Sequence, residues 1–334
     1  MGREPSLIRI GILGASRIVP EALLCPAAKR DDCKIVAIGC SDPRRGAEFA
    51  EMHSIGEVCS DYRELIRRDD IDLVYNALPP SRHADLSIAA LEVGKAVLCE
   101  KPIAMNADEA EQMVAAATRS KGPLIEGFHY RHHPAFRHAL AAVKDSAIGS
   151  IERFEAVFVA PVPYNPGDIR HTLALGGGAL MDMGCYPVHW ARQFLAGPPV
   201  VLNANSQCEI ENIDITTIAE LEFQGGVIAS IECSMDANRS FGSSLTIWGS
   251  RGKLHFDNPL APQNGHTIMI DGRSGRKTVT VAGQSTYDLQ LDYTLRLMRG
   301  ETTPISGGGD MLANMTAIDQ IYEKAGLVRR QTLA

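Results

Sequence analysis

The sequence predicts an α/β domain built on a doubly wound parallel sheet, followed by an α+β domain. In the first 127 of the 334 residues, short aliphatic runs alternate with helical patterns, as they do in doubly wound folds. After residue 150 the runs become longer and alternate between apolar and polar residues, which is typical of antiparallel strands with one buried face. A chain of this length also favours two domains over one. We therefore place the first domain at residues 1–127 and the second at residues 128–334.

The first domain begins with a strand at residues 7–13, a turn at Gly14 and a helical pattern that runs through Leu24. Helix-bounding side chains delimit the later elements, since Asp42 and Asn106 are N-cap types and Gly94 is a typical helix end. Further strands are expected at residues 33–40, 73–78, 96–100 and 124–128, with helices at residues 43–53, 81–93 and 106–120.

The second domain begins with a helix at residues 134–146 and continues mainly as strands. The strands are expected at residues 151–159, 216–223, 227–235, 243–248 and 253–256, and the helices at residues 179–195, 287–299 and 310–325. Long alternating strands of this kind predict a large, mostly antiparallel sheet.

The composition is that of an ordinary globular protein, with 45% hydrophobic and 22% charged residues. A formal net charge of -7 argues against a nucleic-acid partner, because binding to phosphate backbones needs a concentrated basic face. The eight cysteines include no Cys-x-x-Cys pair, so we expect free thiols in a reducing, cytoplasmic environment. No apolar run approaches the roughly 20 residues of a membrane span, so we expect no membrane partner.

The turn after the first strand stands where a dinucleotide-binding fingerprint, Gly-x-Gly-x-x-Gly, would lie, but it keeps only Gly14. Ser16 and Val19 occupy the second and third glycine positions. Ser16 is small enough to admit a pyrophosphate at the N-terminus of the next helix. An ordinary turn between a strand and a helix is the alternative interpretation. The candidate cofactor residues of this turn are Gly11, Gly14, Ser16, Arg17 and Ile18.

The end of the second strand bears on the choice between NAD and NADP. An acid at this place holds the ribose of NAD, whereas small polar residues and arginines admit the extra phosphate of NADP. Cys40 stands where the acid is expected, Ser41 is small, and Arg44 and Arg45 follow. We therefore expect NADP, with NAD as the second choice. The alternative is that Asp42 holds the ribose and the arginines form a solvated helix face.

Lys101 follows the strand at residues 96–100 and precedes Pro102, which ends the strand. Because ligands bind at the carboxyl ends of parallel strands, Lys101 is a candidate catalytic residue. A nicotinamide ring beside it would lower its pKa toward the range useful in proton transfer. Glu100 is then its ion-pair partner or a residue that positions the ring. A solvated loop lysine is the alternative.

A second candidate cluster lies on the helix predicted at residues 179–195. Asp182, Tyr186 and His189 are spaced i, i+4 and i+7, so they share one helix face. A buried tyrosine hydroxyl beside a carboxylate and an ammonium can relay a proton. The alternative is that Asp182 caps the helix and Tyr186 packs as an aromatic side chain.

Histidines crowd the segment from residue 128 to residue 138, which contains His129, His132, His133 and His138. A metal site would need a carboxylate or thiolate at ligand spacing, and the sequence places none there, so we expect no metal. The segment is interpreted either as a polar wall of the substrate cleft, with His129 and Arg131 as candidate contacts, or as a solvated domain junction.

Four motifs together resemble one enzyme family. They are residues 11–16 (Gly-Ile-Leu-Gly-Ala-Ser), residues 76–83 (Asn-Ala-Leu-Pro-Pro-Ser-Arg-His), Glu100-Lys101-Pro102 and residues 177–186 (Gly-Gly-Ala-Leu-Met-Asp-Met-Gly-Cys-Tyr). On these motifs the chain is identified as a member of the Gfo/Idh/MocA oxidoreductase family. Tyr186 makes it similar to the branch of dihydrodiol dehydrogenase, D-xylose dehydrogenase and glucose-fructose oxidoreductase. The resemblance implies a Rossmann domain that binds the dinucleotide and an α+β domain that binds substrate and oligomerises through its open sheet.

The resemblance also implies roles for individual residues. Tyr186 would be the acid/base, Lys101 would orient the reacting carbinol, and Asp182 would orient the substrate or the tyrosine. His83 would lie along the cofactor. Together with the residues found above, the candidate cofactor contacts outside the glycine turn are Ser41, Arg44, Arg45, Leu78, Pro79, His83, Glu100 and Lys101, and the candidate substrate contacts are His129, Arg131, Arg170 and His189.

The implied activity is hydride transfer between nicotinamide C4 and a secondary alcohol or hemiacetal carbon. The expected substrate is a small polyol, sugar, sugar derivative or trans-dihydrodiol, and the expected assembly is a homodimer or homotetramer joined through the C-terminal sheet. Two other interpretations stay open: a non-catalytic NAD(P)-sensing regulator on the same fold, and an NAD-dependent glycoside hydrolase in which transient oxidation permits elimination.

Overall fold

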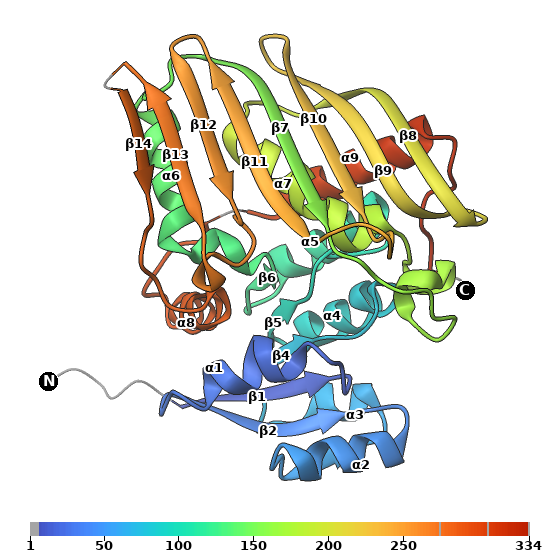
Figure 1. Ribbon diagram of the computed structural model, residues 1–334. Helices are drawn as coiled ribbons and strands as arrows, with labels where there is room; N and C mark the ends of the chain where they lie inside the picture. Colours follow the sequence, from blue (N-terminus) through green and yellow to red (C-terminus); the bar gives the residue numbers. More distant parts are fainter. Residues whose placement is uncertain (1–6, 274, 306, 333–334) are drawn as a thin grey trace, which may run out of the picture. The chain divides into compact units, whose positions relative to one another are not determined.

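A computed structural model describes residues 7–273, 275–305 and 307–332 of the chain (Figure 1). The chain divides into two compact units. Unit 1 comprises Met1–Gly127 and Tyr287–Leu312, and unit 2 comprises Phe128–Thr286 and Ala313–Ala334. Residues 287–312, which the sequence assigns to the second domain, therefore belong to unit 1.

Within the described residues, unit 1 holds a six-stranded parallel sheet in the order β3-β2-β1-β4-β5-β6. Its strands are β1 (Ile8–Leu13), β2 (Cys33–Gly39), β3 (Glu57–Cys59), β4 (Leu73–Asn76), β5 (Ala96–Cys99) and β6 (Leu124–Glu126). Because β2 and β4 flank β1, the strand order reverses there, and dinucleotides bind at the carboxyl ends of strands beside such a reversal. The predicted doubly wound sheet is confirmed.

Two helices of unit 1, α2 and α5, begin at caps that the sequence predicts. The carboxylate of Asp42 accepts hydrogen bonds from the N–H groups of Arg44 and Arg45, and the side chain of Asn106 accepts one from Glu109 N–H at 3.0 Å. Short helical turns are labelled η. The helical elements are η1 (Pro20–Leu24), α1 (Cys25–Ala27), α2 (Pro43–Met52), α3 (Tyr62–Arg67), η2 (Pro80–Arg82), α4 (His83–Glu92), α5 (Ala107–Arg119) and, from its second residue on, α8 (Thr286–Met298).

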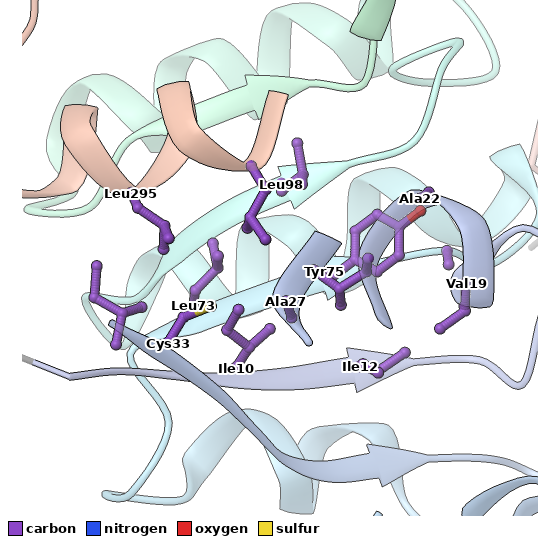
Figure 2. Close-up of a cluster of buried hydrophobic side chains, with 14 of the residues drawn as sticks. Ile10, Ile12, Val19, Ala22, Ala27, Cys33, Leu73, Tyr75, Leu98 and Leu295 are labelled. Carbon is purple, nitrogen blue, oxygen red and sulfur yellow. The ribbon is translucent and has the colours of Figure 1, made fainter. Parts of the chain in front are cut away.

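An apolar cluster joins α8 to the sheet of unit 1 (Figure 2). Ile10 of β1, Tyr75 of β4 and Leu98 of β5 are at most 1% exposed, and Leu291 and Leu295 of α8 pack in the same cluster. Burying one leucine side chain contributes about 1.5–3 kcal/mol. The apolar stripe of α8 therefore explains why this late segment belongs to unit 1.

The described residues of unit 2 form an eight-stranded sheet in the order β14-β13-β12-β11-β7-β10-β9-β8. Its strands are β7 (Ile151–Val159), β8 (Val200–Ile210), β9 (Ile213–Phe223), β10 (Val227–Ser234), β11 (Gly242–Gly249), β12 (Gly252–Asp257), β13 (Thr267–Gly272) and β14 (Gly275–Val279). Strands β7 and β10 pair in parallel, and the other neighbours pair antiparallel. The predicted mostly antiparallel sheet is confirmed, and β8, β13 and β14 are additions to it.

Helices α6 and α7 lie against one face of this sheet (Figure 1). The helical elements of unit 2 are η3 (His129–His132), α6 (Pro134–Lys144), η4 (Ile169–His171), η5 (Leu173–Leu175), η6 (Leu180–Gly184), α7 (Cys185–Phe194), η7 (Pro262–Asn264) and, from Ala313 on, α9 (Gly308–Lys324). The helix predicted at residues 179–195 is thus a π-helical turn followed by α7. Within the described ranges, no helix has the length and apolar character needed to cross a bilayer.

Candidate functional site

In unit 1, the turn after β1 has a backbone that only glycine fits. Gly14 has a φ of 95°, and its N–H donates to the carbonyl of Gly39 at 2.9 Å. A Cβ on Gly14 would lie 2.7 Å from Cδ2 of Leu78. At Gly11, a Cβ would lie 2.6 Å from Cδ1 of Ile71, so this glycine permits close packing beside the strand.

The residues after Gly14 lead directly into a helix. Ser16 is half-buried and Arg17 is exposed. The carbonyl of Ile18 accepts the N–H of Ala22 at 2.8 Å, which starts the helical hydrogen-bonding pattern. The turn therefore stands at the positive end of a helix, which favours an anionic ligand.

At the end of β2, Ser41 is held by a tyrosine that the sequence did not single out. Ser41 N–H donates to the Tyr62 hydroxyl at 3.2 Å, and that hydroxyl donates to Ser41 Oγ at 3.3 Å. The guanidinium of Arg82 lies 5.9 Å from the centroid of the Tyr62 ring. Two polar groups and a cation thus gather at the place where the adenosine ribose of a dinucleotide binds in this fold.

The acid and the arginines that follow have separate partners. Asp42 is the N-cap of α2, so its carboxylate is engaged with backbone N–H groups. Arg44 forms an exposed pair with Glu48 at 2.8 Å, and Arg45 is exposed beside it. Cys40, at the position of the expected acid, is fully buried. Oδ1 of Asp42 accepts both cap hydrogen bonds, and the exposed Arg44 and Arg45 beside it fit the NADP interpretation.

The loop that carries Lys101 is fixed by two buried carboxylates. The hydroxyl of Tyr75 donates to Glu100 at 2.6 Å, and burial with this carboxylate nearby raises the pKa of Tyr75 well above its usual value. The N–H of Ile103 donates to Glu126 at 2.9 Å. Lys101 lies between these anchors and is half-buried.

His83 ties this loop to the end of β4. Its ring nitrogens lie 2.9 Å from the carbonyl oxygen of Pro102, which follows Lys101 through a cis peptide bond, and 2.7 Å from that of Leu78. Burial lowers the pKa of the ring. Leu78 and Pro79, two expected cofactor contacts, are half-buried. Within unit 1, the ring of His83 therefore lies between two loops that each bear candidate site residues, and as a neutral ring it donates to one of the two carbonyl oxygens.

In unit 2, Asp182 is bound by an arginine from a preceding turn. Nε of Arg170 donates to Asp182 at 2.5 Å, and Asp168 lies 3.3 Å from the same guanidinium. Asp182, together with Asp168, raises the pKa of Arg170. Asp182 is not the cap of its helix, so the capping alternative is set aside.

A buried ion pair supports the turn on which Asp182 lies. Arg330 and Asp214 are 3.0 Å apart, and both side chains are fully buried. Arg330 Nε donates to the carbonyl of Gly177 at 2.8 Å, and Asp214 accepts from Leu180 N–H at 2.7 Å and from the Tyr322 hydroxyl at 3.0 Å. The pair thus anchors the glycine run and the first turn of the helix.

Tyr186 is buried against aromatic side chains, with its hydroxyl directed to a histidine. It is 4% exposed, and its hydroxyl lies 3.3 Å from Nε2 of His129. The rings of Phe128 and Phe158 meet it edge-on, with centroids 5.4 and 5.6 Å away. The interpretation of Tyr186 as a proton relay and its interpretation as a packed aromatic side chain are therefore compatible. Its ring packs against aromatic side chains, and its hydroxyl lies beside a histidine nitrogen.

His189 and Arg131 belong to a polar network next to Tyr186. His189 stacks on Phe128 with centroids 4.0 Å apart, and its Nδ1 shares a hydrogen bond with the Tyr130 hydroxyl. Gln193 lies 3.4 Å from His189 Nε2 and accepts a hydrogen bond from Arg131 at 3.3 Å. His189 is 1% exposed, so its ring contacts these neighbouring side chains and little solvent.

The remaining histidines of the segment have separate surroundings. His133 is the N-cap of α6 and accepts the N–H of Ala135 at 3.1 Å, whereas His138 is exposed. In the part of the chain that the structure describes, no three or more His, Cys, Asp or Glu side chains are grouped so as to hold a metal ion.

Several residues around the candidates were not found from the sequence. They are Tyr62, Tyr75, Asp214, Thr286 and Arg330. Asp214 had a detectable signal, because a single acid between Ile213 and Ile215 in an apolar strand indicates a buried partner. The other four residues gave no signal in the sequence, because the side chains that they bind lie 21 or more residues away in the chain.

Two family models match the chain. The model of an oxidoreductase family with an NAD-binding Rossmann fold, GFO_IDH_MocA, matches residues 8–128. The model of the GFO/IDH/MocA C-terminal domain matches residues 136–255.

Relatives and solved structures agree with these matches. A dTDP-3,4-didehydro-2,6-dideoxy-α-D-glucose 3-reductase from Saccharopolyspora spinosa is 34% identical over 78% of this chain and 77% of its own. An NADP(+) D-xylose 1-dehydrogenase from Haloferax volcanii is 30% identical over 94% and 96% of the two chains. The structure of a 3-ketoreductase from Actinomadura kijaniata, in complex with NADP and TDP-benzene, has a TM-score of 0.86 at 26% identity and covers 96% of this chain and 98% of its own. The resemblance drawn from the motifs is confirmed, and the chain belongs to the GFO/IDH/MocA family of oxidoreductases.

Proposed function

We propose that the protein is an NADP-preferring oxidoreductase that acts on a secondary alcohol or hemiacetal carbon of a sugar or sugar derivative. The observation that carries this proposal is the setting of Tyr186. Its hydroxyl is buried, lies 3.3 Å from a ring nitrogen of His129, and belongs to the same helical segment as Asp182. A phenol in such surroundings is suited to exchanging a proton with a substrate hydroxyl.

The residues of unit 1 fit a bound NADP. Gly14, with its positive φ of 95°, allows the tight turn after β1 that leads into a helix N-terminus, where a pyrophosphate would bind. Ser41, which follows β2, and Arg44 and Arg45, in the first turn of α2, are exposed and would hold the 2′-phosphate by hydrogen bonds and charge. When bound, the cofactor supplies or accepts the hydride at nicotinamide C4. The relatives with NADP in their names support this choice.

Three side chains would handle the proton and the charge. In oxidation, the Tyr186 oxygen takes the proton of the substrate hydroxyl, and in reduction it returns the proton. The ammonium of Lys101 stabilises the negative charge that develops on the substrate oxygen. Asp182 accepts a hydrogen bond from a neighbouring substrate hydroxyl while Arg170 holds its carboxylate in place.

A sugar is the favoured substrate class for two reasons. Asp182 and Arg170 offer an acceptor and a donor side by side, and their side chains are 25% and 31% exposed, so both can reach a ligand. Such a pair suits adjacent hydroxyl groups. The relatives named above are a deoxysugar reductase and a xylose dehydrogenase, which supports the same class.

A substrate panel tests the proposal. The protein is assayed with NADP and with NAD on aldoses, nucleotide-linked keto sugars, inositols and trans-dihydrodiols, with nicotinamide absorbance as the readout. We expect turnover of at least one sugar with NADP preferred. Tyr186→Phe and Lys101→Met are expected to lower kcat by about 10²- to 10³-fold while cofactor binding, followed by fluorescence, is kept.

Other outcomes would contradict the proposal. Tight NADP binding without turnover of any compound would indicate a nucleotide-sensing regulator. Redox-neutral release of a sugar with retained cofactor would indicate a glycoside hydrolase. Parental turnover in both variants would remove Tyr186 and Lys101 from the mechanism.

The proposal includes a homodimer or homotetramer formed through the sheet of unit 2. Its support is the exposure of Ile218 and Val200, 49% and 61%, on the neighbouring strands β9 and β8. Light scattering after size exclusion should show an oligomer, and Ile218→Lys should shift it to smaller species. A monomeric parent would contradict this part.

A further inference from the structure

A buried polar chain within unit 2 leads from Tyr186 to Gln263. The Tyr186 hydroxyl lies 3.3 Å from Nε2 of His129, and Nδ1 of His129 lies 2.8 Å from the hydroxyl of Thr286. Gln263 donates to the same threonine oxygen at 3.4 Å. Tyr186 and His129 are each 4% exposed, and Thr286 is fully buried. Four segments far apart in sequence therefore meet in one hydrogen-bonded series.

The donors and acceptors are compatible with hydrogen bonds that run in one direction from Gln263 to Tyr186. The amide nitrogen of Gln263 donates to Oγ1 of Thr286, which leaves the Thr286 proton available to His129 Nδ1. A neutral imidazole that accepts at Nδ1 carries its proton on Nε2. In that arrangement, the Nε2–H group of His129 donates to the oxygen of Tyr186 across the 3.3 Å between them.

An N–H group that donates to the phenol oxygen would favour proton transfer from Tyr186 to a substrate. The proton of the phenol is not the one shared with His129, so it can be exchanged with a substrate. As that proton leaves, negative charge grows on the tyrosine oxygen. A donor already held in place stabilises this charge without reorganisation.

We propose that His129 is a positioning residue for the reaction: held as its Nε2–H tautomer by Thr286, it orients the Tyr186 hydroxyl and stabilises the phenolate. In reduction, the carbonyl carbon would receive a hydride from the bound cofactor, and the π electron pair would move to the substrate oxygen and form an O–H bond with the proton of Tyr186. The O–H bond of Tyr186 breaks, and its electron pair stays on the phenolate oxygen. The Nε2–H bond of His129 stays intact. This inference rests on the proposed function, in which Tyr186 exchanges the proton.

Two substitutions of His129 separate donation from packing. His129→Gln can place an amide N–H near the position of Nε2, whereas His129→Leu fills space without a donor. We expect His129→Leu to lower kcat by about 10- to 100-fold, below the loss of a direct oxyanion donor, with the KM for NADP little changed. His129→Gln should recover most of this loss.

Thr286 provides a second, independent pair of variants. Thr286→Val removes the hydroxyl that fixes the tautomer and should lower kcat about fivefold, as expected for one hydrogen bond. Thr286→Ser keeps the hydroxyl and should behave like the parent. This pair keeps the test decisive if His129→Leu does not fold.

His133 supplies the matched control. It lies four residues after His129 and is also buried, but its ring caps α6. His133→Asn keeps a capping side chain, so kcat should equal that of the parent. In a Tyr186→Phe background, His129→Leu should cause no additional loss, because its effect acts through the phenol.

The inference is overturned if His129→Leu and Thr286→Val retain parental kcat, if His129→Gln is as impaired as His129→Leu, or if His129→Leu still lowers turnover in the Tyr186→Phe protein. Failure of the proposed function has a different signature. In that case the parent itself turns over no alcohol or ketone, and the inference falls with it.

Discussion

The carboxylate of Asp182 accepts a hydrogen bond from Nε of Arg170 at 2.5 Å, and both side chains stay partly exposed, at 25% and 31%. Asp168, which is buried, holds the same guanidinium from the other side at 3.3 Å. A planar guanidinium with two carboxylate partners keeps one orientation. Asp182 is therefore presented in a fixed position.

Removing this guanidinium should weaken substrate recognition. We expect Arg170→Leu to lower kcat/KM for the best substrate by about 10- to 100-fold, because a charged hydrogen bond contributes about 1.5–3 kcal/mol. The KM for NADP should change little. Arg170→Lys keeps the charge and should lose less. Steady-state kinetics with each substrate varied in turn checks this, and an unchanged kcat/KM in Arg170→Leu would contradict it.

A carboxylate at the end of β2 should reverse the cofactor preference. Ser41→Asp places a negative charge where the 2′-phosphate of NADP is proposed to bind, so kcat/KM with NADP should fall by at least about tenfold while that with NAD rises. Ser41→Ala is the control and should weaken NADP only moderately. An equal fall with both cofactors would show that position 41 does not distinguish them.

The fold of unit 1 was largely predictable because its strands are buried on both faces. The four residues of β4 and the four of β5 are all buried, which produces continuous apolar runs in the sequence. The short elements β3 and α3 were missed, since three and six residues are too few for a periodic pattern. In unit 2, β8 was missed because it is exposed at most positions, Val200 and Leu202 included.

From the sequence, we could predict only those parts of the candidate site whose residues lie close together in the chain. Asp182, Tyr186 and His189 lie on one helical segment, as their spacing predicted, although Asp182 is in its π-helical turn and the other two are in α7. Their partners come from other segments: Arg170 from η4, and His129 and Tyr130 from η3. Such pairings depend on tertiary packing, and no local pattern encodes them. The roles assigned to these residues stay predictions until the variants are measured.

The buried pair Asp214 and Arg330 should make a large contribution to stability. Arg330→Met leaves a buried carboxylate without its charge partner, which costs about 3–5 kcal/mol. The double variant Asp214→Leu/Arg330→Met should recover part of this loss. The control is Arg276→Met, whose pair with Asp271 is 68% and 50% exposed and should change stability by less than about 1 kcal/mol.

Urea unfolding followed by tryptophan fluorescence measures these differences, because Trp190 is buried in unit 2. A loss in Arg330→Met no larger than that in Arg276→Met would contradict a structural role for the pair. Since Arg330 also binds the carbonyl of Gly177, its loss should lower kcat as well.

Stability should depend on pH through His133. Burial, with His266 nearby, lowers the pKa of this imidazole from 6.5 to about 4. Between these two pH values the unfolded chain binds the proton and the folded chain does not. The stability that this group contributes is therefore present above pH 6.5 and is lost as the pH falls toward 4, by at most about 3 kcal/mol.

His133→Asn removes this proton uptake while it keeps a side chain able to cap α6. Between pH 7 and pH 5, the free energy of unfolding of the parent should therefore fall more steeply than that of the variant. Urea titrations of both proteins at pH 7, 6 and 5 measure the two slopes, and the other histidines contribute equally to each. Parallel slopes would mean that His133 binds its proton equally well in the folded and unfolded chain, which would contradict the effect of its burial.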